Sequence, residues 1–200
     1  VLVIGISGAT RSGKSTLARA LNNWLGTACD RSSIVNLDRF FRARIREKTA
    51  GNWDTPEALD FDAFYETIQV IPSTTEADAA SLRFVIFEGF MGFHDSRVNN
   101  IADVKIHLTL SKDTCRQRRA NTKPVPDGYF DRCIWPNATA YSALVDRLPD
   151  IRFLDAEQSP RGVLEAVAKI VREASPCTLP ELPPYEEPEP INQVPLVVSE

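Results

Sequence analysis

A short segment near the start of the chain has the residue types and spacing that bind phosphate. It consists of Gly8, Ala9, Thr10, Arg11, Ser12, Gly13, Lys14, Ser15 and Thr16. The two glycines allow backbone angles that are closed to other residues, so successive N–H groups can point at one anion. In this G-x-x-x-x-G-K-S pattern the lysine reaches the terminal phosphates and the serine hydroxyl holds Mg2+. We therefore expect residues 8–16 to bind a nucleoside triphosphate, with Lys14 also catalytic; the alternative is a glycine-containing turn that binds nothing.

Two elements must position this loop. Residues 1–6 are an uninterrupted apolar run rich in Val and Ile, which is typical of a strand buried on both faces. From Thr16 the apolar residues recur at helical spacing until about residue 26. A strand, a glycine loop and a helix in this order make a phosphate-binding loop, and the positive end of the helix adds to the attraction.

Two acidic residues follow predicted strands. Residues 33–37 and 82–87 read as strands, and they end in Asp38 and Glu88. Ligands of open parallel sheets bind beyond the carboxyl ends of the strands, so both carboxylates should lie near the phosphate loop. Asp38 could take the proton from an attacking hydroxyl or help hold a metal, and Glu88 could lie beside that metal or its water shell. The alternatives are an Asp38 that caps the following turn and a Glu88 that is a buried structural acid.

Trp53 and Asp54 form a candidate pair for binding a sugar and a ring. An exposed aromatic beside an acid can stack a ring and bind sugar hydroxyls, whereas a Trp in the core is an equally good interpretation. The next residues predict a helix with Asp54 or Thr55 as its cap and Pro56 in its first turn. Its apolar stripe would be Leu59, Phe61, Phe64 and Ile68.

Basic residues are concentrated in two places. The helix that Ser111 opens contains Arg116, Arg118 and Arg119, and the last two point to different sides, so one can meet ATP phosphates while the other faces an acceptor. A solvated basic face is the alternative. The stretch from Arg39 to Lys48 reads as a solvated loop or helix face, with phosphate contact as the less favoured interpretation, and His107 reads as an ordinary strand residue.

Composition limits the function further. The chain has 200 residues, of which 43% are apolar and 25% charged, as expected for one globular domain. A formal charge of −4 gives no support for a nucleic-acid or membrane partner. The four scattered cysteines suggest reduced thiols, and no apolar run approaches the roughly 20 residues of a membrane helix. We expect a cytoplasmic protein, with the nucleus as an alternative.

The remaining elements complete an alternating pattern. Strands are expected at 104–110 and 151–155, and helices at 137–147 and 161–173. Strands that alternate with helices predict an α/β fold with a parallel sheet. From Ser175 the composition changes: seven of the 14 prolines lie between Pro176 and Pro195, which predicts an extended tail without a core of its own. The expected division is therefore a domain at 1–173 and a Pro/Glu-rich tail at 174–200.

Five passages together make the chain resemble the P-loop nucleoside kinases, and among them the nicotinamide riboside kinases. Besides residues 5–15, they are Asp38-Arg39-Phe40-Phe41, Trp53-Asp54 through Ala58-Leu59, Glu88-Gly89-Phe90, and Gly128-Tyr129-Phe130-Asp131 with Trp135-Pro136. The last passage is the most specific of the five. The resemblance covers residues 1–173 and implies a P-loop NTPase fold, with a five-stranded parallel sheet flanked by helices and a small mobile lid.

The resemblance also implies an activity: ATP-dependent phosphorylation of the 5′-hydroxyl of nicotinamide riboside, giving nicotinamide mononucleotide for NAD synthesis. Asp38 would be the base and, with Ser15 and Glu88, would lie at Mg2+. Trp53 would stack on nicotinamide and Asp54 would bind ribose, with Arg39, Phe40 and Phe41 beside the acceptor. Arg118 would contact ATP and act in catalysis, Arg119 would contact the riboside, and Gln158, Ser159 and Pro160 would border the adenine.

Three features depart from that family. Arg39 follows Asp38 where an acid is more familiar, and the lid loop at 122–128 is about three residues short, without a clear second stacking tyrosine. Thr122 or Lys123 stands where a lid arginine is expected. These changes touch the acceptor side, so a uridine or cytidine kinase of the same fold is the nearest alternative. A nucleotide-binding module without acceptor chemistry is the alternative from another class, although the chain lacks a guanine-reading N-K-x-D motif.

Overall fold

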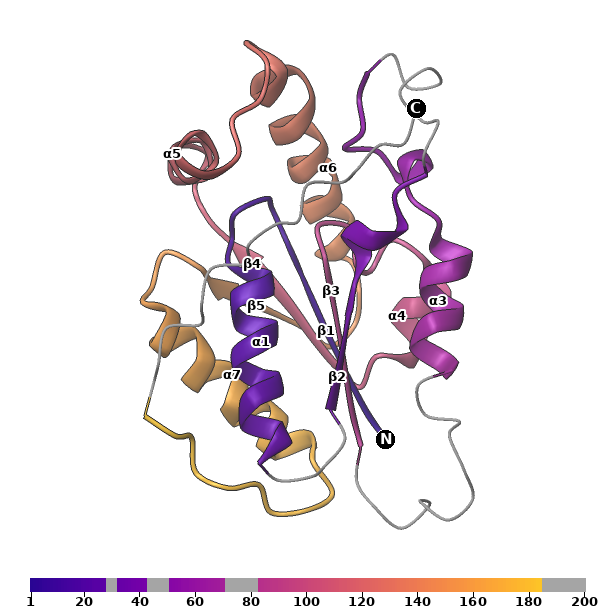
Figure 1. The fold of residues 1–200 in the computed structure, drawn as a ribbon, viewed down its shortest axis with the longest axis vertical. Coiled ribbons are helices and arrows are strands. Elements are labelled where there is room, and N and C mark those ends of the chain that lie inside the picture. The colour runs from indigo at the N-terminus through magenta and orange to yellow at the C-terminus, as the bar shows by residue number, and fades with distance from the viewer. Residues whose placement is uncertain (28–31, 43–50, 71–82, 185–200) are drawn as a thin grey trace.

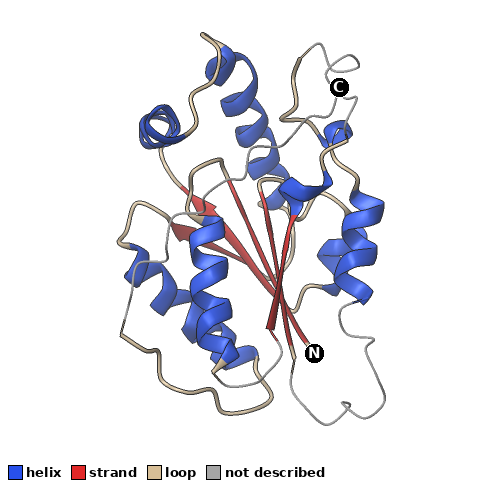
Figure 2. Ribbon diagram, viewed as in Figure 1, coloured by secondary structure: helices blue, strands red, loops and turns tan. Residues whose placement is uncertain are grey.

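A parallel sheet lies at the centre of the computed structural model, which describes residues 1–27, 32–42, 51–70 and 83–184. Within these ranges five strands pair in the order β2-β3-β1-β4-β5 (Figures 1 and 2). They are β1 (Leu2–Gly8), β2 (Ser32–Asn36), β3 (Phe84–Gly89), β4 (Val104–Thr109) and β5 (Ile151–Asp155). The expected fold class is therefore confirmed. The predicted basic stretch at 39–48 and the predicted tail lie partly outside the described residues.

The sheet is built from the most apolar strands at its centre. Every residue of β1 and β3 is buried, as their unbroken apolar sequences require. β1 pairs with β3 on one side and with β4 on the other, so the loop after β1 lies where the strand order reverses. Ligands of open α/β sheets bind at such a switch point.

Helices cover both faces of the sheet (Figure 1). On one face α1 (Lys14–Gly26) and α7 (Pro160–Ala174) pack their apolar stripes against β1, β3 and β4. On the other face lie α3 (Phe61–Val70), α4 (Ser96–Ile101) and α6 (Trp135–Val145). Within the described residues, a third and smaller cluster forms around Cys115, Tyr129, Phe130 and Ile134, beyond the carboxyl end of the sheet.

The helix expected after Thr55 is interrupted, which corrects that prediction. A short 3-10 turn, η2 (Pro56–Ala58), is followed by extended backbone at Leu59, and the side chain of Thr55 makes no capping hydrogen bond. Leu59 pairs with Phe41 in an isolated antiparallel bridge. The backbone hydrogen bonds of this bridge require Leu59 to be extended, and this tertiary pairing overrides the helix propensity of the local sequence. The helix proper begins at Phe61.

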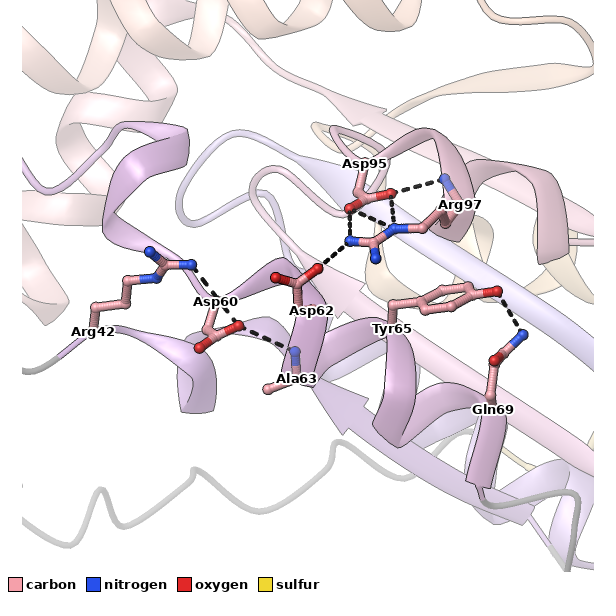
Figure 3. Close-up of polar contacts among 8 residues, drawn as sticks. All are labelled: Arg42, Asp60, Asp62, Ala63, Tyr65, Gln69, Asp95 and Arg97. Atoms are coloured by element: carbon pink, nitrogen blue, oxygen red, sulfur yellow. Dashed lines mark hydrogen bonds and ion pairs between the residues drawn. The ribbon is translucent and has the colours of Figure 1, made fainter.

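The start of α3 is held by side chains from two neighbouring segments (Figure 3). An Asp60 carboxylate oxygen accepts a hydrogen bond from the Ala63 N–H at 3.1 Å, and Arg42 lies 3.9 Å from the same oxygen. Arg97 joins α3 to the start of α4, with Nη2 2.7 Å from Asp62 and 2.6 Å from Asp95. These exposed pairs contribute little stability individually, but they fix the segment that follows Trp53 and Asp54.

The region after β4 contains one more difference from expectation. α5 (Lys112–Thr122) begins as predicted, with the Ser111 hydroxyl accepting from the Thr114 N–H. A π-helix, η5 (Phe130–Ile134), then leads directly into α6, which begins two residues earlier than expected. Pro136, which has no backbone N–H to donate, is the second residue of α6 and lies directly after the π-helical turn. Asp131 in the π-turn pairs with Arg116 and Lys112 of α5.

Two expectations from composition concern cysteines and membranes. In the described ranges Cys115 is buried, Cys133 is half-buried and Cys177 is exposed, and all three are free thiols. Cys29 lies outside the described residues. No helix in the described part of the chain is long and apolar enough to cross a membrane.

The proline-rich segment is attached to the fold over its first ten residues. Residues 175–184, here called the strap, run along α7 and α1. Leu179 is only 6% exposed and packs in the core cluster between the sheet and these two helices. The carbonyl of Pro180 accepts hydrogen bonds from the Trp24 indole at 3.1 Å and from Arg172 at 2.9 Å. Arg161 at the start of α7 donates to the Pro183 carbonyl. The strap therefore extends the core of the domain, and the rest of the expected tail lies outside the described residues.

We predict that the strap stabilises the fold through Leu179. Leu179→Ala should lower the free energy of unfolding by about 2–3 kcal/mol, because it removes a buried side chain at the edge of the core. Urea denaturation of the two proteins measures this difference. The matched control is Glu181→Ala, which removes a side chain that is 99% exposed and should change stability by less than about 0.5 kcal/mol. Equal stability of Leu179→Ala and the unmodified chain would show that the strap contributes nothing.

Candidate active site

The loop between β1 and α1 adopts the backbone that its glycines allow. Gly8, Arg11 and Gly13 have φ of 142°, 61° and 90°. A Cβ at Gly8 would lie 2.4 Å from the Leu108 carbonyl oxygen, so that glycine is required for packing. A Cβ at Gly13 would meet no described atom within 4 Å, so the space in front of the α1 N-terminus is open. This geometry provides N–H groups facing an open site, as phosphate binding requires.

Lys14 is held inside this loop. Its Nζ donates a hydrogen bond to the Ala9 carbonyl at 2.8 Å, and the side chain is buried. Burial lowers the pKa of Lys14, and the carboxylates of Glu88 and Asp38 oppose that shift. The ammonium group therefore lies between the loop and two acids, where it can reach a bound phosphate.

Glu88 and Ser15 are brought together by the strand order. β3 lies between β1 and β2, so Glu88 is in register with Ile6 and Asn36. The Ser15 hydroxyl donates to Glu88 Oε1 at 2.9 Å, and Glu88 is 3% exposed. Burial raises the pKa of Glu88, while Lys14 and the Ser15 hydrogen bond oppose the rise. The placement agrees with the expected role at the edge of a metal site.

Asp38 lies in the short 3-10 helix η1 (Leu37–Phe40) and is exposed. The cap of this turn is Asn36, whose side-chain oxygen accepts from the Asp38 N–H at 2.7 Å, so the Asp38 carboxylate itself is not the cap. Burial lowers the pKa of Lys14 and of Arg11, and the negative charge of Asp38 opposes both shifts. The carboxylate thus faces the phosphate loop and is available for chemistry.

Arg118 and Arg119 diverge from α5 as the sequence predicts. Arg118 donates to the Ala156 carbonyl, just after β5, at 3.1 Å from each Nη atom, and to the Arg11 carbonyl at 3.4 Å. Arg119 Nη1 donates to the Thr10 hydroxyl at 2.8 Å. The Arg118 side chain therefore contacts the segment after β5, and the Arg119 side chain contacts the phosphate loop.

The residues expected to border adenine follow β5. Gln158, Ser159 and Pro160 are exposed, and the Ser159 hydroxyl caps α7 by accepting from the Gly162 N–H at 3.1 Å. Arg118 reaches the neighbouring Ala156. The segment thus lies beside Arg118, but contact with adenine stays a prediction.

Several buried polar atoms around the loop lack a hydrogen-bond partner among the described residues: Arg11 Nε, Ser12 Oγ and Arg119 Nε. Buried polar groups are normally paired. Burial lowers the pKa of Arg11, and the positive charge of Arg119 lowers it further. Two guanidinium groups at one place, each with an unpaired donor, fit an anion between them. The phosphates of ATP would satisfy these donors.

A polar contact connects β1 to β4 directly beneath the loop. Ser7 Oγ lies 2.8 Å from His107 Nδ1, and both side chains are buried. Burial, together with the positive charge of Lys14, lowers the pKa of His107 to about 4. A neutral imidazole that hydrogen-bonds a strand neighbour agrees with the structural interpretation of His107.

On the acceptor side, Trp53 and Asp54 share one partner that sequence reasoning missed. The Tyr129 hydroxyl donates to Asp54 Oδ2 at 2.9 Å and accepts from the Trp53 N–H at 3.1 Å. The Trp53 and Tyr129 rings lie 5.5 Å apart at 46°. Tyr129 belongs to the Gly128-Tyr129-Phe130-Asp131 passage, which marked the family resemblance without giving a role to the tyrosine. Trp53 is half-buried and packs at the edge of the third cluster.

A pocket lies between the phosphate loop and this pair. Its lining is Ala9, Thr10, Asp54, Phe90, Met91, Ile134, Asn137, Ala138 and Tyr141. Sequence reasoning named the loop residues and Asp54 but not the α6 residues, which carry no motif signal. Asn137 Nδ2 lies 3.4 Å from Asn52 Oδ1, which also accepts from the Asp54 N–H at 3.1 Å. The pocket therefore lies between the phosphate loop and the segment that contains Trp53 and Asp54.

The three residues after Asp38 take different positions. Phe41 is 41% exposed and stacks on the pocket residue Phe90, with ring centroids 6.1 Å apart. Phe40 instead packs edge-on against Phe64, 5.3 Å away, in the second core cluster. Its expected contact with the acceptor stays a prediction, since Phe90 and Met91 pack in the same cluster and also line the pocket. Arg39 is exposed.

Comparison with known proteins agrees with this geometry. The model of the phosphoribulokinase / uridine kinase family matches residues 3–85. Nicotinamide riboside kinase 1 of Homo sapiens is 28% identical over 86% of this chain and 92% of its own length. Nicotinamide riboside kinase 2 of Mus musculus is 26% identical over 86% of this chain and 95% of its own length. The resemblance to nicotinamide riboside kinases, within the uridine kinase-like P-loop superfamily, is confirmed.

Other relatives support the same fold. A solved structure from Silicibacter sp. TM1040, assigned to a fructose transport system kinase, aligns with a TM-score of 0.58 at 24% identity over 76% of this chain and 89% of that one. A gluconokinase from Sinorhizobium meliloti 1021 aligns with a TM-score of 0.51 at 17% identity over 86% and 93%. These two likenesses show the fold alone. The sequence relatives support a nucleoside kinase, which is a phosphotransferase.

The unpaired Nε atoms of Arg11 and Arg119 lead to a prediction for Arg11. Arg11→Asn keeps a residue that tolerates positive φ but removes the charge. We expect the affinity for ATP with Mg2+ to fall about tenfold, because one charge-assisted contact to phosphate is lost. Thermal stability of the free protein should not fall, since the repulsion between Arg11 and Arg119 is removed. Isothermal titration calorimetry measures the affinity, with Lys169→Ala on the exposed face of α7 as the control; unchanged affinity in Arg11→Asn would contradict the phosphate contact.

Proposed function

We propose that this chain phosphorylates the 5′-hydroxyl of nicotinamide riboside with ATP, giving nicotinamide mononucleotide for NAD synthesis. The observation that carries the proposal is the pocket in which Asp54 lies opposite Ala9 and Thr10 of the phosphate loop. An acid that can bind ribose hydroxyls is thereby next to the loop that can bind ATP. The similarity to nicotinamide riboside kinases along most of both chains supports this acceptor.

The donor side of the proposed site consists of the loop and α5. The N–H groups of residues 8–16 would bind the phosphates together with Lys14 and Arg118, and residues 158–160 would border the adenine. Ser15, Glu88 and Asp38 have the oxygen ligands that Mg2+ prefers, and nucleotide-bound Mg2+ needs only one or two protein carboxylates. When bound, Mg2+ neutralises charge on the transferred phosphoryl group.

The acceptor side consists of the Trp53 loop and the walls of the pocket. The Asp54 carboxylate would accept hydrogen bonds from the ribose hydroxyls, and the Trp53 ring would stack on nicotinamide. Phe41 and Phe90, which stack on each other, provide an apolar wall on another side. Burial raises the pKa of Asp54, and the positive charge of Arg119 opposes that rise, so Arg119 acts on both the loop and the acid.

The transfer step needs a base and positive charge. Asp38 would take the proton of the 5′-hydroxyl as its oxygen forms a bond to the γ-phosphorus. The bond from that phosphorus to the bridging oxygen of ADP breaks at the same time. Lys14, Arg118 and the Arg11–Arg119 pair would stabilise the negative charge on the transferred group.

The second candidate is a uridine or cytidine kinase. The matching family model includes uridine kinases, and uridine/cytidine kinase UKL1, chloroplastic, of Arabidopsis thaliana is 28% identical over 63% of this chain and 30% of its own length. The fold and the phosphate loop serve both acceptors equally. Only the acceptor loop and pocket distinguish them.

A panel of acceptors tests the proposal. Nicotinamide riboside, nicotinic acid riboside, uridine and cytidine are compared by ADP release in the presence of ATP and Mg2+. We expect the highest kcat/KM with nicotinamide riboside. A higher value with uridine or cytidine would replace this proposal by the second candidate, and ATP binding without turnover of any acceptor would leave only a nucleotide-binding module.

In the same assay Asp38→Ala should lower kcat at least about a hundredfold, since the transfer loses its base. Its affinity for ATP, measured by calorimetry, should remain within a few-fold of the unmodified chain. The control is Glu66→Ala, which removes an exposed carboxylate from α3. Normal turnover in Asp38→Ala would exclude Asp38 as the base.

A further inference from the structure

Tyr129 connects two parts of the proposed site that are far apart in the sequence. It directly precedes the π-helix η5, and its N–H donates to the Pro126 carbonyl at 3.0 Å, so its backbone is tied to the turn before it. The side chain is only 7% exposed and packs with Phe130 and Ile134. A buried phenol must find polar partners for its hydroxyl.

Both polar partners of that hydroxyl lie in the acceptor loop. Tyr129 Oη accepts from the Trp53 N–H and donates to Asp54 Oδ2, and the two aromatic rings are in contact. One hydroxyl therefore fixes the backbone at Trp53 and the rotamer of Asp54. Burial raises the pKa of Tyr129, so the hydroxyl keeps its proton and can continue to donate.

The Asp54 carboxylate lies in a strongly charged environment. Burial raises its pKa, whereas the Tyr129 hydrogen bond and the positive charges of Arg119 and Lys123 lower it, and Asp38 raises it. An ionised carboxylate can accept hydrogen bonds from two adjacent ribose hydroxyls, but a protonated one cannot accept both equally well. The hydrogen bond from Tyr129 thus favours the form that binds a ribose, and it leaves lone pairs on both oxygens free.

We propose that Tyr129 is a positioning residue for the riboside, because its hydroxyl orients the Asp54 carboxylate toward the ribose and holds the Trp53 ring beside the base. This inference rests on the proposed function, whose acceptor site it defines more closely. Tyr129 does not contact the reacting atoms; it acts through its two neighbours. Recognition of the ribose and recognition of the base thereby both depend on the Tyr129 hydroxyl.

The test is Tyr129→Phe, which removes only the hydroxyl. We expect KM for the riboside to rise about tenfold, the effect of losing one hydrogen bond to a charged group, with little change in kcat or in KM for ATP. The acidic limb of kcat/KM for the riboside should move to higher pH, since a contact that lowers the pKa of Asp54 is lost. The matched control is Tyr65→Phe on α3, whose hydroxyl accepts only from the Gln69 side chain among the described residues.

A double-mutant cycle with Asp54→Asn separates positioning from a general structural role. If Tyr129 acts through the Asp54 charge, Tyr129→Phe should raise KM less in the Asp54→Asn variant than in the unmodified chain, because only the lost Trp53 contact remains to weaken binding in that variant. The acidic limb of the pH profile should be absent in Asp54→Asn and in the double variant. Additive effects, or a rise in KM for ATP equal to that for the riboside, would overturn the inference. So would a Tyr129→Phe variant identical to the unmodified chain.

Different results would exclude the proposed function and the role of Tyr129. If the unmodified chain phosphorylates none of the ribosides, the proposed function is wrong. If it phosphorylates one of them and Tyr129→Phe leaves its KM and pH profile unchanged, the proposed function stands and the role of Tyr129 is wrong.

Discussion

Positive charge gathered at the carboxyl end of β1 is the constraint on which the rest of the site depends. Lys14 is buried, and Arg11 and Arg119 each bury a donor that has no partner among the described residues. Buried charges are costly unless they are paired. Glu88 and Asp38 compensate part of this charge, and a bound triphosphate would compensate the remainder. The strand order is what places these groups together, because β1 lies between β3 and β4 with β2 beyond β3.

The acceptor loop is attached to this charged centre by short, specific contacts. Phe41 pairs with Leu59, the Asp60 N–H donates to the Phe40 carbonyl at 2.8 Å, and the Arg42 N–H donates to the Ala58 carbonyl at 2.9 Å. The segment that follows Asp38 is thus paired with the segment that follows Asp54. Under the proposed function, this pairing would hold Asp38 as the base and Asp54 as the ribose-binding acid in a fixed relation, as transfer between two bound substrates requires.

The parts of the fold with strong local signals could be predicted from the sequence. The apolar run of β1, the glycine loop and the helical spacing of α7 specify their own structure, and strands that end in Asp38 and Glu88 indicate a shared edge. The break in the helix at Leu59 could not be predicted. It depends on the pairing of Leu59 with Phe41, whereas the local sequence from Pro56 onward favours a continuous helix. The partnership of Tyr129 with Asp54 joins residues 75 positions apart, and no spacing rule links them. Proline content predicts an extended tail, but it gives no signal for the anchoring of residues 175–184 by Trp24 and Arg172, which depends on tertiary packing.

The central claim is that a phosphoryl group passes from ATP to the 5′-oxygen of a riboside bound beside Asp54. Phosphorus NMR of a reaction with ATP, Mg2+ and nicotinamide riboside tests it most directly, because it identifies the bond that forms. The account predicts a new phosphate monoester signal coupled to the C5′ protons, growing in step with ADP. Release of inorganic phosphate with ADP and no ester, or an ester on another hydroxyl, would contradict it.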